Sequence, residues 1–138
     1  MYFEMQYRVP YGDTDKMGVV YYANYLEYFE RGRPELMRHA GMSYADMERA
    51  GFMLPVSEAY CKYIRSAKYD DLLTFRSWVS SYSRVKFTIC TEVRRDDELL
   101  ASGHVVLGCV DVNTFKVTRM PQQVADFCAK CALEEEKK

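Results

Sequence analysis

The chain is 138 residues long, which is enough for one domain with a substantial core and too short for two. Its 49% hydrophobic and 28% charged residues are typical of a soluble globular protein, and a net charge of −1 argues against generic binding to nucleic acid or acidic membranes. Residues 1–6 lack the basic start and apolar run of a signal peptide, and no apolar stretch approaches the roughly 20 residues that span a bilayer. We therefore expect a single domain over residues 1–138, located in the cytoplasm and without a membrane span.

The first elements in the chain are a strand and a long helix. Residues 3–9 alternate well enough to predict a strand, which a proline and a glycine then end. Over residues 22–40 apolar side chains recur at near-helical spacing, and Gly41 follows as a helix-ending residue. Pro34 interrupts this pattern because proline lacks an N–H and disfavours helix at the preceding residue. We interpret the segment as one bent helix, with two shorter helices as the alternative.

Beyond the long helix, the pattern changes from helical to strand-like. Ser43 can cap a short helix that runs through Arg49. Residues 85–93 alternate between apolar and polar side chains, as expected of an antiparallel sheet with one covered face. Asp96 and Asp97 are expected at a hairpin turn. The predicted strands are residues 56–64, 72–82, 86–95, 99–111 and a short one at 115–119.

The chain is expected to close with a helix from Pro121 to Cys131 and a frayed tail over residues 134–138. The whole order is therefore strand, long helix and then consecutive antiparallel strands. This order predicts an α+β fold with segregated elements and not a parallel βαβ sheet.

The five cysteines form an odd set spread through apolar stretches, as expected of reduced thiols packed as small hydrophobic side chains. Cys128 and Cys131 form a C-x-x-C pair, but zinc would need two more ligands and a redox pair normally follows a strand in a βαβ unit. Since the two lie in a predicted helix, we expect them to share a face. The sequence predicts no metal and no redox cofactor. The full set is Cys61, Cys90, Cys109, Cys128 and Cys131.

The segment over residues 11–25, YGDTDKMGVVYYANY, places two carboxylates, Asp13 and Asp15, in a glycine-flanked loop that runs into the long helix. Unpaired N–H groups and the positive end of a helix dipole can hold a carbonyl oxygen or oxyanion, while a nearby carboxylate attacks or activates water. The segment suggests acyl transfer without a serine or cysteine nucleophile. The alternative is that both acids are turn formers bonded to nearby N–H groups.

These residues also resemble a known family. Residues 13–15, 18–25 and 28–31, followed by Pro55-Val56 and by residues 69–73, resemble the hotdog-fold acyl-CoA thioesterases of the 4-hydroxybenzoyl-CoA thioesterase type. The resemblance implies a curled antiparallel sheet wrapped around one long helix, with subunits paired edge to edge as a homodimer or homotetramer. It also implies hydrolysis of an acyl-CoA substrate to a free acid and CoA.

The resemblance assigns roles within the acidic loop. Asp15 occupies the position of the family's catalytic carboxylate, so Asp13 is left a structural role. The backbone N–H of Tyr22 would polarise the thioester carbonyl, and Gly18 would let the backbone approach the substrate or simply form a turn. Many relatives have histidine where this chain has Tyr22, so the reaction does not require an imidazole there. Asp15 would either attack the thioester directly or activate water, and the sequence leaves both open.

Further candidates for substrate binding each carry a structural alternative. Arg84 and Lys86 could bind the CoA phosphates or be solvated charges at a strand end. Tyr25 could line the acyl pocket, as could Phe29, or both could be core residues. Asn24 could contact substrate, cap the helix or bond within the loop.

Several other polar residues are interpreted as structural. Glu30 is a second candidate acid, because other hotdog thioesterases use an acid on the central helix, but an ion-paired helix face is the preferred interpretation. His39 and His104 are interpreted as structural or surface residues.

The leading hypothesis is therefore an acyl-CoA thioesterase. A noncatalytic acyl-thioester binding protein on the same scaffold is the alternative. Dehydration or isomerisation of a hydroxyacyl thioester ranks last, because the loop has no histidine. The acyl group, aliphatic or aromatic, is left open.

Overall fold

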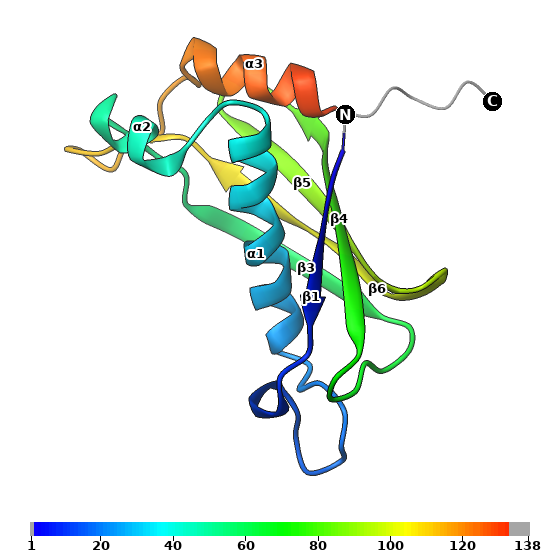
Figure 1. Cartoon of the computed structure of the whole chain (residues 1–138). Coiled ribbons are helices and arrows are strands. Elements are labelled where there is room, and N and C mark those ends of the chain that lie inside the picture. The colour runs from blue at the N-terminus through cyan, green and yellow to red at the C-terminus, as the bar shows by residue number, and fades with distance from the viewer. Residues whose placement is uncertain (1, 133–138) are drawn as a thin grey trace.

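A five-stranded antiparallel sheet forms the body of the molecule in the computed structural model, which describes residues 2–132 (Figure 1). The strands lie in the order β1-β4-β5-β6-β3, and irregularities in register interrupt the β4–β5, β5–β6 and β3–β6 pairs. Such bulges increase the local twist, so the sheet curls. The strands are β1 (Phe3–Arg8), β3 (Val56–Tyr63), β4 (Leu72–Tyr82), β5 (Lys86–Arg95) and β6 (Glu98–Gly108).

One face of this sheet is covered by helices. Figure 1 shows α1 (Asn24–His39) lying along the sheet and α3 (Gln122–Cys131) across its upper end. In β5 the side chains alternate as predicted, with Phe87, Ile89 and Val93 buried under the helices. This curled antiparallel sheet around a long helix confirms the predicted α+β hotdog architecture.

The long helix is one continuous element, as predicted, and contains Pro34 without breaking. The alternative of two shorter helices is therefore wrong. α1 begins at Asn24 and not at Tyr22, because residues 21–24 first form a turn in which the Asn24 N–H donates to the Tyr21 carbonyl at 2.9 Å.

The other predicted helices are also present. The Ser43 hydroxyl accepts the Asp46 N–H at 3.2 Å and caps α2 (Tyr44–Arg49), as expected. α3 follows Pro121 directly and puts both Cys128 and Cys131 on its buried side. The predicted tail over residues 134–138 lies outside the described residues.

The predicted strand over residues 115–119 is wrong. Asp111 accepts the N–H groups of Asn113 and Thr114 at 2.8 and 3.0 Å, which tightens a turn and lowers the pKa of this carboxylate. Phe115 then takes a left-handed φ of 57°, which no strand accommodates. A single bridge between Val110 and Val117 remains.

The strand predicted over residues 99–111 is divided in two. β6 ends at Gly108, and β7 (Val110–Asp111) pairs instead with β2 (Phe52–Met53), a two-residue strand that the sequence did not predict. The β5–β6 hairpin turns at Asp96 and Asp97 as predicted, with Asp96 at φ 55°.

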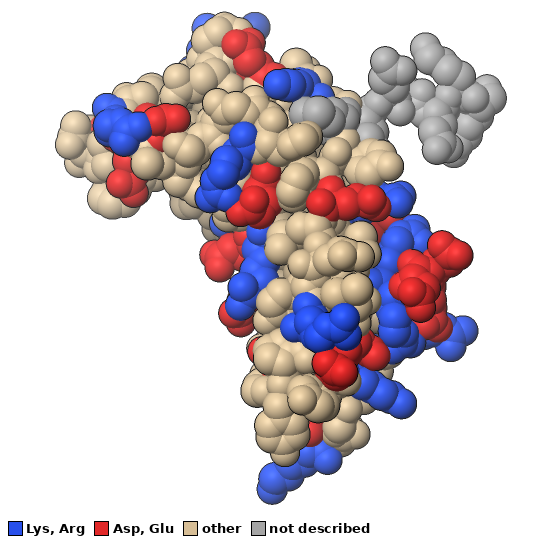
Figure 2. All heavy atoms as spheres, in the orientation of Figure 1, with Lys and Arg blue, Asp and Glu red and all other residues tan. Residues whose placement is uncertain are grey.

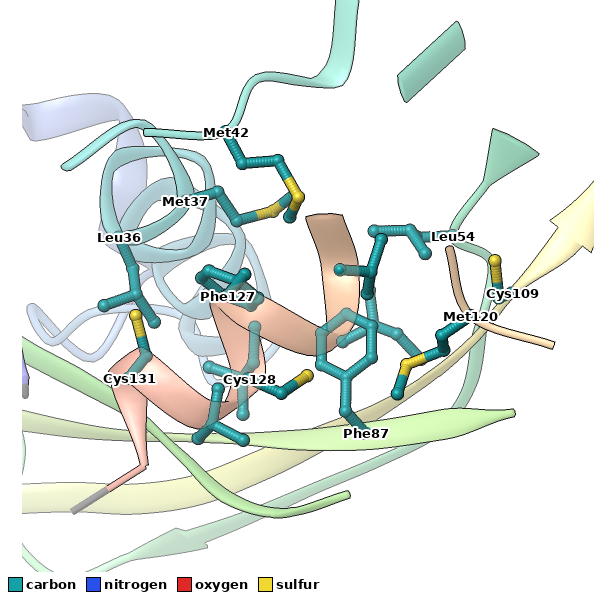
Figure 3. Close-up of a cluster of buried hydrophobic side chains, with 14 of the residues drawn as sticks. Leu36, Met37, Met42, Leu54, Phe87, Cys109, Met120, Phe127, Cys128 and Cys131 are labelled. Carbon is teal, nitrogen blue, oxygen red and sulfur yellow. The ribbon is translucent and has the colours of Figure 1, made fainter. Parts of the chain in front are cut away.

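The core falls into two clusters, which we call the apolar cluster and the tyrosine cluster. The apolar cluster joins α3 to α1 and the sheet through aliphatic, sulfur-containing and phenyl side chains (Figure 3). It consists of Leu36, Met37, Met42, Met47, Leu54, Val79, Phe87, Ile89, Val105, Leu107, Cys109, Met120, Val124, Phe127, Cys128 and Cys131. The tyrosine cluster lies under the first half of α1 and consists of Val9, Val20, Tyr25, Tyr28, Phe29, Ala67, Leu73, Phe75, Val93, Leu100 and Ala101, with Tyr7 packed against them.

Acidic and basic side chains alternate over the exposed face of α1 (Figure 2). Glu30 belongs to this pattern, because its carboxylate pairs with Arg33 at 3.8 Å. The preferred interpretation of Glu30 as an ion-paired surface residue therefore agrees with the structure. Over residues 2–132, no helix is both long and apolar enough to cross a membrane.

Candidate active site

The acidic loop folds back on itself before it enters α1. A single 3₁₀ turn (Tyr11–Asp13) follows β1, and the Asp15 N–H then donates to the Val19 carbonyl at 3.0 Å. The Asp15 carbonyl accepts the Gly18 N–H at 3.0 Å, and Gly18 has the φ of +79° that closing this turn requires. The turn fixes the backbone on both sides of Asp15.

The Asp15 carboxylate is left partly free. Its Oδ1 accepts the Met17 N–H at 2.8 Å, while Oδ2 has no hydrogen-bond donor among residues 2–132. One oxygen therefore orients the side chain and the other remains available to a ligand.

Asp15 lines a cavity of about 340 Å³. Three tyrosines form much of the wall, and the ring centroid of Tyr63 lies 6.2 Å from that of Tyr22 and 5.2 Å from that of Tyr25 in edge-on contacts. Such rings provide a rigid apolar surface with polar edges. The lining residues are Asp15, Met17, Val19, Val20, Tyr22, Tyr25, Tyr63, Ile64, Arg65 and Ser66.

The backbone N–H of Tyr22 has no acceptor among the described residues. Its peptide group is nevertheless held, because the Tyr21 carbonyl accepts the Asn24 N–H at 2.9 Å. The next carbonyl, that of Tyr22, accepts the Tyr63 hydroxyl at 2.9 Å. An unpaired donor on a fixed peptide, at the positive end of a helix, can polarise a carbonyl oxygen.

The structure gives the remaining loop candidates mainly structural contacts. The Asn24 side chain donates to the Asp13 carbonyl at 3.0 Å, and neither Asn24 nor Gly18 lines the cavity. Tyr25 does line it while being 3% exposed, and its hydroxyl accepts the Ala67 N–H at 3.3 Å. Tyr25 is thus both wall and core, whereas Phe29 belongs to the tyrosine cluster alone.

Arg84 and Lys86 lie at the opposite end of the sheet from Asp15. β4 begins at Leu72, which pairs with Arg8 just before the acidic loop, and its other end leads into the turn that contains Arg84. The length of the 11-residue strand at about 3.3 Å per residue separates the two ends. Within one subunit, the structure does not bring these two cations to the Asp15 cavity.

Sequence reasoning missed the far wall of the cavity, which follows the end of β3. Tyr63, Ile64, Arg65 and Ser66 line it. An ion-pair network supports this wall from behind: Arg95 contacts the Asp71 carboxylate at 2.7 Å, the Glu98 carboxylate at 2.6 Å and the Ser66 carbonyl at 3.3 Å. Only the pairing of distant strands brings these residues to the loop.

The thiols do not compete as nucleophiles at this site. Cys61 packs beside the tyrosine cluster, and burial raises the pKa of its thiol, which disfavours the reactive thiolate. In the region that the structure covers, no three His, Cys, Asp or Glu side chains are grouped so as to hold a metal ion. Among the described residues that line the cavity, Asp15 is the only carboxylate, and its Oδ2 is free.

Comparison with known proteins places the chain in a family. The family model described as the thioesterase-like superfamily matches residues 9–128. The acyl-CoA thioester hydrolase YbgC of Escherichia coli is 33% identical over 129 residues, covering 91% of this chain and 95% of that protein. The acyl-CoA thioesterase YbgC of Haemophilus influenzae is 32% identical over 123 residues, covering 88% and 90% respectively.

A solved structure agrees with these sequence matches. A DHNA-CoA thioesterase from Staphylococcus aureus superposes with a TM-score of 0.87 and 32% identity, over 94% of this chain and 89% of that one. The chain therefore belongs to the thioesterase-like superfamily and has its hotdog fold.

Proposed function

We propose that this protein is an acyl-CoA thioesterase that hydrolyses a thioester to a free acid and CoA, with Asp15 as the catalytic carboxylate. The observation that carries the proposal is that two residues line the same cavity: Asp15, whose Oδ2 is free, and Tyr22, whose backbone N–H is unpaired among the described residues. Family membership and the names of the relatives support the same reaction.

The two groups suit hydrolysis of a thioester. The Tyr22 N–H would stabilise the oxyanion that forms on the thioester carbonyl, and loss of one such donor typically costs about 3 kcal/mol. Asp15 would either attack the carbonyl carbon, giving a mixed anhydride that water then cleaves, or remove a proton from the attacking water. In both routes the C–S bond breaks and CoA leaves as a thiolate, so a dedicated general acid is not required.

We propose that the active unit contains at least two copies of the chain. β3 is the last strand of the sheet, it pairs only with β6 among the described residues, and Val56, Tyr60 and Tyr63 on it are 46 to 52% exposed. An unprotected edge of eight residues favours strand pairing with another chain. We expect sedimentation velocity to show a dimer or tetramer, and a monomer at micromolar concentration would contradict this pairing.

Pairing of two β3 strands would bring Arg84 and Lys86 of one copy toward the Asp15 cavity of the other. Antiparallel pairing of two β3 strands places the Val56 end of one copy beside the Tyr63 end of the other. Lys86 pairs with Gly108, at the Val56 end of the sheet. Arg84 and Lys86 of the second copy would therefore lie at the same end of the joined sheet as Asp15, where they could bind CoA phosphates.

Arg65 offers a cation within the same subunit, because it lines the cavity itself. Its guanidinium pairs with Glu98 at 3.0 Å and is largely exposed. We expect Arg65→Ala and Arg84→Ala each to raise KM for acyl-CoA without lowering kcat. The matched control is hydrolysis of a truncated pantetheine thioester, which lacks the nucleotide phosphates. An equal loss on both substrates would contradict phosphate binding.

Chromatographic detection of free CoA tests the proposal directly. We expect wild type to release CoA from at least one member of a panel of aliphatic and aromatic acyl-CoAs. Folded Asp15→Asn should lose about 1,000-fold in kcat, because a catalytic acid or base contributes about 10² to 10⁴. Thr14→Ala is the neighbouring control and should retain most activity. Binding without turnover by wild type would instead favour the noncatalytic acyl-thioester binding protein.

A further inference from the structure

Asp13, the first acid of the loop, is a centre of hydrogen bonding that joins three parts of the chain. Its Oδ2 accepts the hydroxyl of Tyr28 at 2.8 Å and that of Tyr7 at 3.1 Å. Its backbone carbonyl accepts the Asn24 side-chain amide at 3.0 Å and the Tyr21 N–H at 2.9 Å. These partners belong to β1, to α1 and to the segment that leads into α1.

The two phenols are held firmly in place. Tyr28 is 1% exposed, and its ring stacks on Phe75 with centroids 5.1 Å apart. The guanidinium of Arg31 lies 4.7 Å from the centre of the Tyr7 ring. Burial, together with the bond to Asp13, raises the pKa of both phenols, so both remain donors at neutral pH. Hydrogen bonds to a carboxylate are charge-assisted and therefore stronger than those between neutral groups.

This centre connects directly to the two groups proposed to act on the thioester. Asp15 follows Asp13 by two residues in the same constrained loop. The Tyr22 N–H belongs to the peptide bond formed by the Tyr21 carbonyl, and the other side of Tyr21 is tied to Asp13 through its own N–H. Asp13 is therefore linked on one side to the backbone of Asp15 and on the other to the residue whose carbonyl shares a peptide bond with the Tyr22 N–H.

We propose that Asp13 is a positioning residue for the reaction, acting with Tyr28 and Tyr7, and not only a turn former. The proposal rests on the thioesterase function proposed above. Asp13 itself is not a candidate nucleophile, because two phenols occupy its Oδ2 and it does not line the cavity. Its role is to hold the Asp15 carboxylate and the Tyr22 N–H in a fixed position relative to each other.

The test separates kcat from KM in three variants. Asp13→Ala removes the acceptor for both phenols and should lower kcat about 100-fold at unchanged KM, because a displacement of about 1 Å can cost this much. Asp13→Asn keeps a side-chain oxygen that can accept from a phenol, and should restore part of the loss. Tyr28→Phe removes one bond to the carboxylate and should lower kcat about 10-fold.

Tyr44→Phe is the matched control. The Tyr44 hydroxyl accepts the Arg33 Nε–H at 2.7 Å, so this variant also removes a phenol bonded to α1, but toward the other end of the helix. We expect it to lower the thermal midpoint without lowering kcat. If the role of Asp13 is purely structural, Tyr28→Phe should likewise lower the thermal midpoint and leave kcat unchanged.

The outcomes are distinguishable. Wild-type kcat in folded Asp13→Asn and Tyr28→Phe, with only a lower thermal midpoint, would overturn the positioning role. If Asp13→Ala does not fold, these two milder variants decide. If wild type hydrolyses acyl-CoA and requires Asp15 but is insensitive to Asp13 and Tyr28, this inference alone fails. If wild type hydrolyses no thioester, the proposed function fails and the positioning role fails with it.

Discussion

The two halves of the core are built from different interactions. The apolar cluster around α3 contains methionines, leucines, cysteines and phenylalanines, which pack without hydrogen bonds between their side chains (Figure 3). The tyrosine cluster at the other end of the sheet carries phenols whose hydroxyls bond to Asp13 and to the Ala67 amide. Apolar packing is non-directional, whereas hydrogen bonds fix distance and angle. From this difference we expect the apolar cluster mainly to stabilise the fold and the tyrosine cluster mainly to orient the candidate site.

The largest expected effect on stability is in the apolar cluster. Phe127 is 2% exposed and packs edge-on against Phe87, with ring centroids 5.9 Å apart. Phe127→Ala should lower the free energy of unfolding by about 3 to 5 kcal/mol, because it leaves a cavity. Urea unfolding followed by circular dichroism measures this loss. The kcat of the fraction that remains folded should equal that of wild type, and a parallel loss of kcat would break the proposed division between the clusters.

The variant Gly103→Ala tests the same comparison beside the tyrosine cluster. A Cβ there would lie 2.0 Å from the Tyr60 carbonyl oxygen and 2.6 Å from Phe29 Cε2, so β3 or α1 must move. Gly103→Ala should cost about 1 to 3 kcal/mol and also lower kcat, because β3 carries Tyr63 and α1 follows Tyr22.

Gly12→Ala is the control for Gly103→Ala, because nothing lies within 4 Å of the added Cβ. We expect it to change neither stability nor kcat in the two assays. Unaltered kcat in Gly103→Ala would mean that the site tolerates a shift of its supporting strand.

As the pH rises above 9, the apolar cluster should be destabilised first and the tyrosine cluster second. Burial raises the pKa of Cys128 from 9.0 to about 12, and burial with the bond to Asp13 raises that of Tyr28 above 10.0. The folded state keeps these protons while the unfolded chain loses them, so the stability contributed by Cys128 is complete below pH 9 and falls between pH 9 and 12. One such group changes the free energy of unfolding by at most about 1.4 kcal/mol per pH unit.

Urea titrations from pH 8 to 11 measure this slope. Cys128→Ala should flatten it from about pH 9 upward, and Tyr28→Phe only from about pH 10, because these are the ordinary pKa values of a thiol and a phenol in the unfolded chain. If the free energy of unfolding of Cys128→Ala falls with pH as steeply as that of wild type, the raised pKa of Cys128 does not contribute to stability.

The smallest expected effect is at Arg95, behind the cavity wall. This side chain is 28% exposed and bonds to Asp71, Glu98 and the Ser66 carbonyl. Arg95→Ala should cost about 1 kcal/mol or less, and this cost should shrink at high salt because partly exposed ion pairs are screened. Steady-state kinetics at low and high salt would show whether the wall is perturbed. Arg94→Ala, in the neighbouring and equally part-buried pair with Glu92, is the control.

Much of the fold could be predicted because it follows from local periodicity. The alternation in residues 85–93 correctly gave the buried face of β5, and near-helical spacing correctly gave α1 despite Pro34. The errors fall where local patterns are weak. Phe115 is an apolar, strand-favouring residue that a turn forces to positive φ, and β2 is too short to show a period.

The candidate site was predictable only in part. Asp15 and Tyr22 share one short segment, so the sequence could place them together, and the structure puts both at one cavity. Tyr63 and Arg65 line the same cavity from another segment, and nothing in their local sequence indicates this. Arg84 carries a positive charge suited to phosphate, but its distance from Asp15 depends on strand order.

By itself, the sequence determined the three helices, most of the strands, the buried side of β5 and a carboxylate loop at a helix start, because periodicity and turn chemistry act between near neighbours. Only the tertiary structure decided that Tyr7 and Tyr28 meet at Asp13 and that Tyr63 meets the Tyr22 carbonyl. These contacts depend on strand order and register, which are set by side chains far apart in the chain packing against one another. The geometry of the site is therefore a property of the folded sheet and helix together.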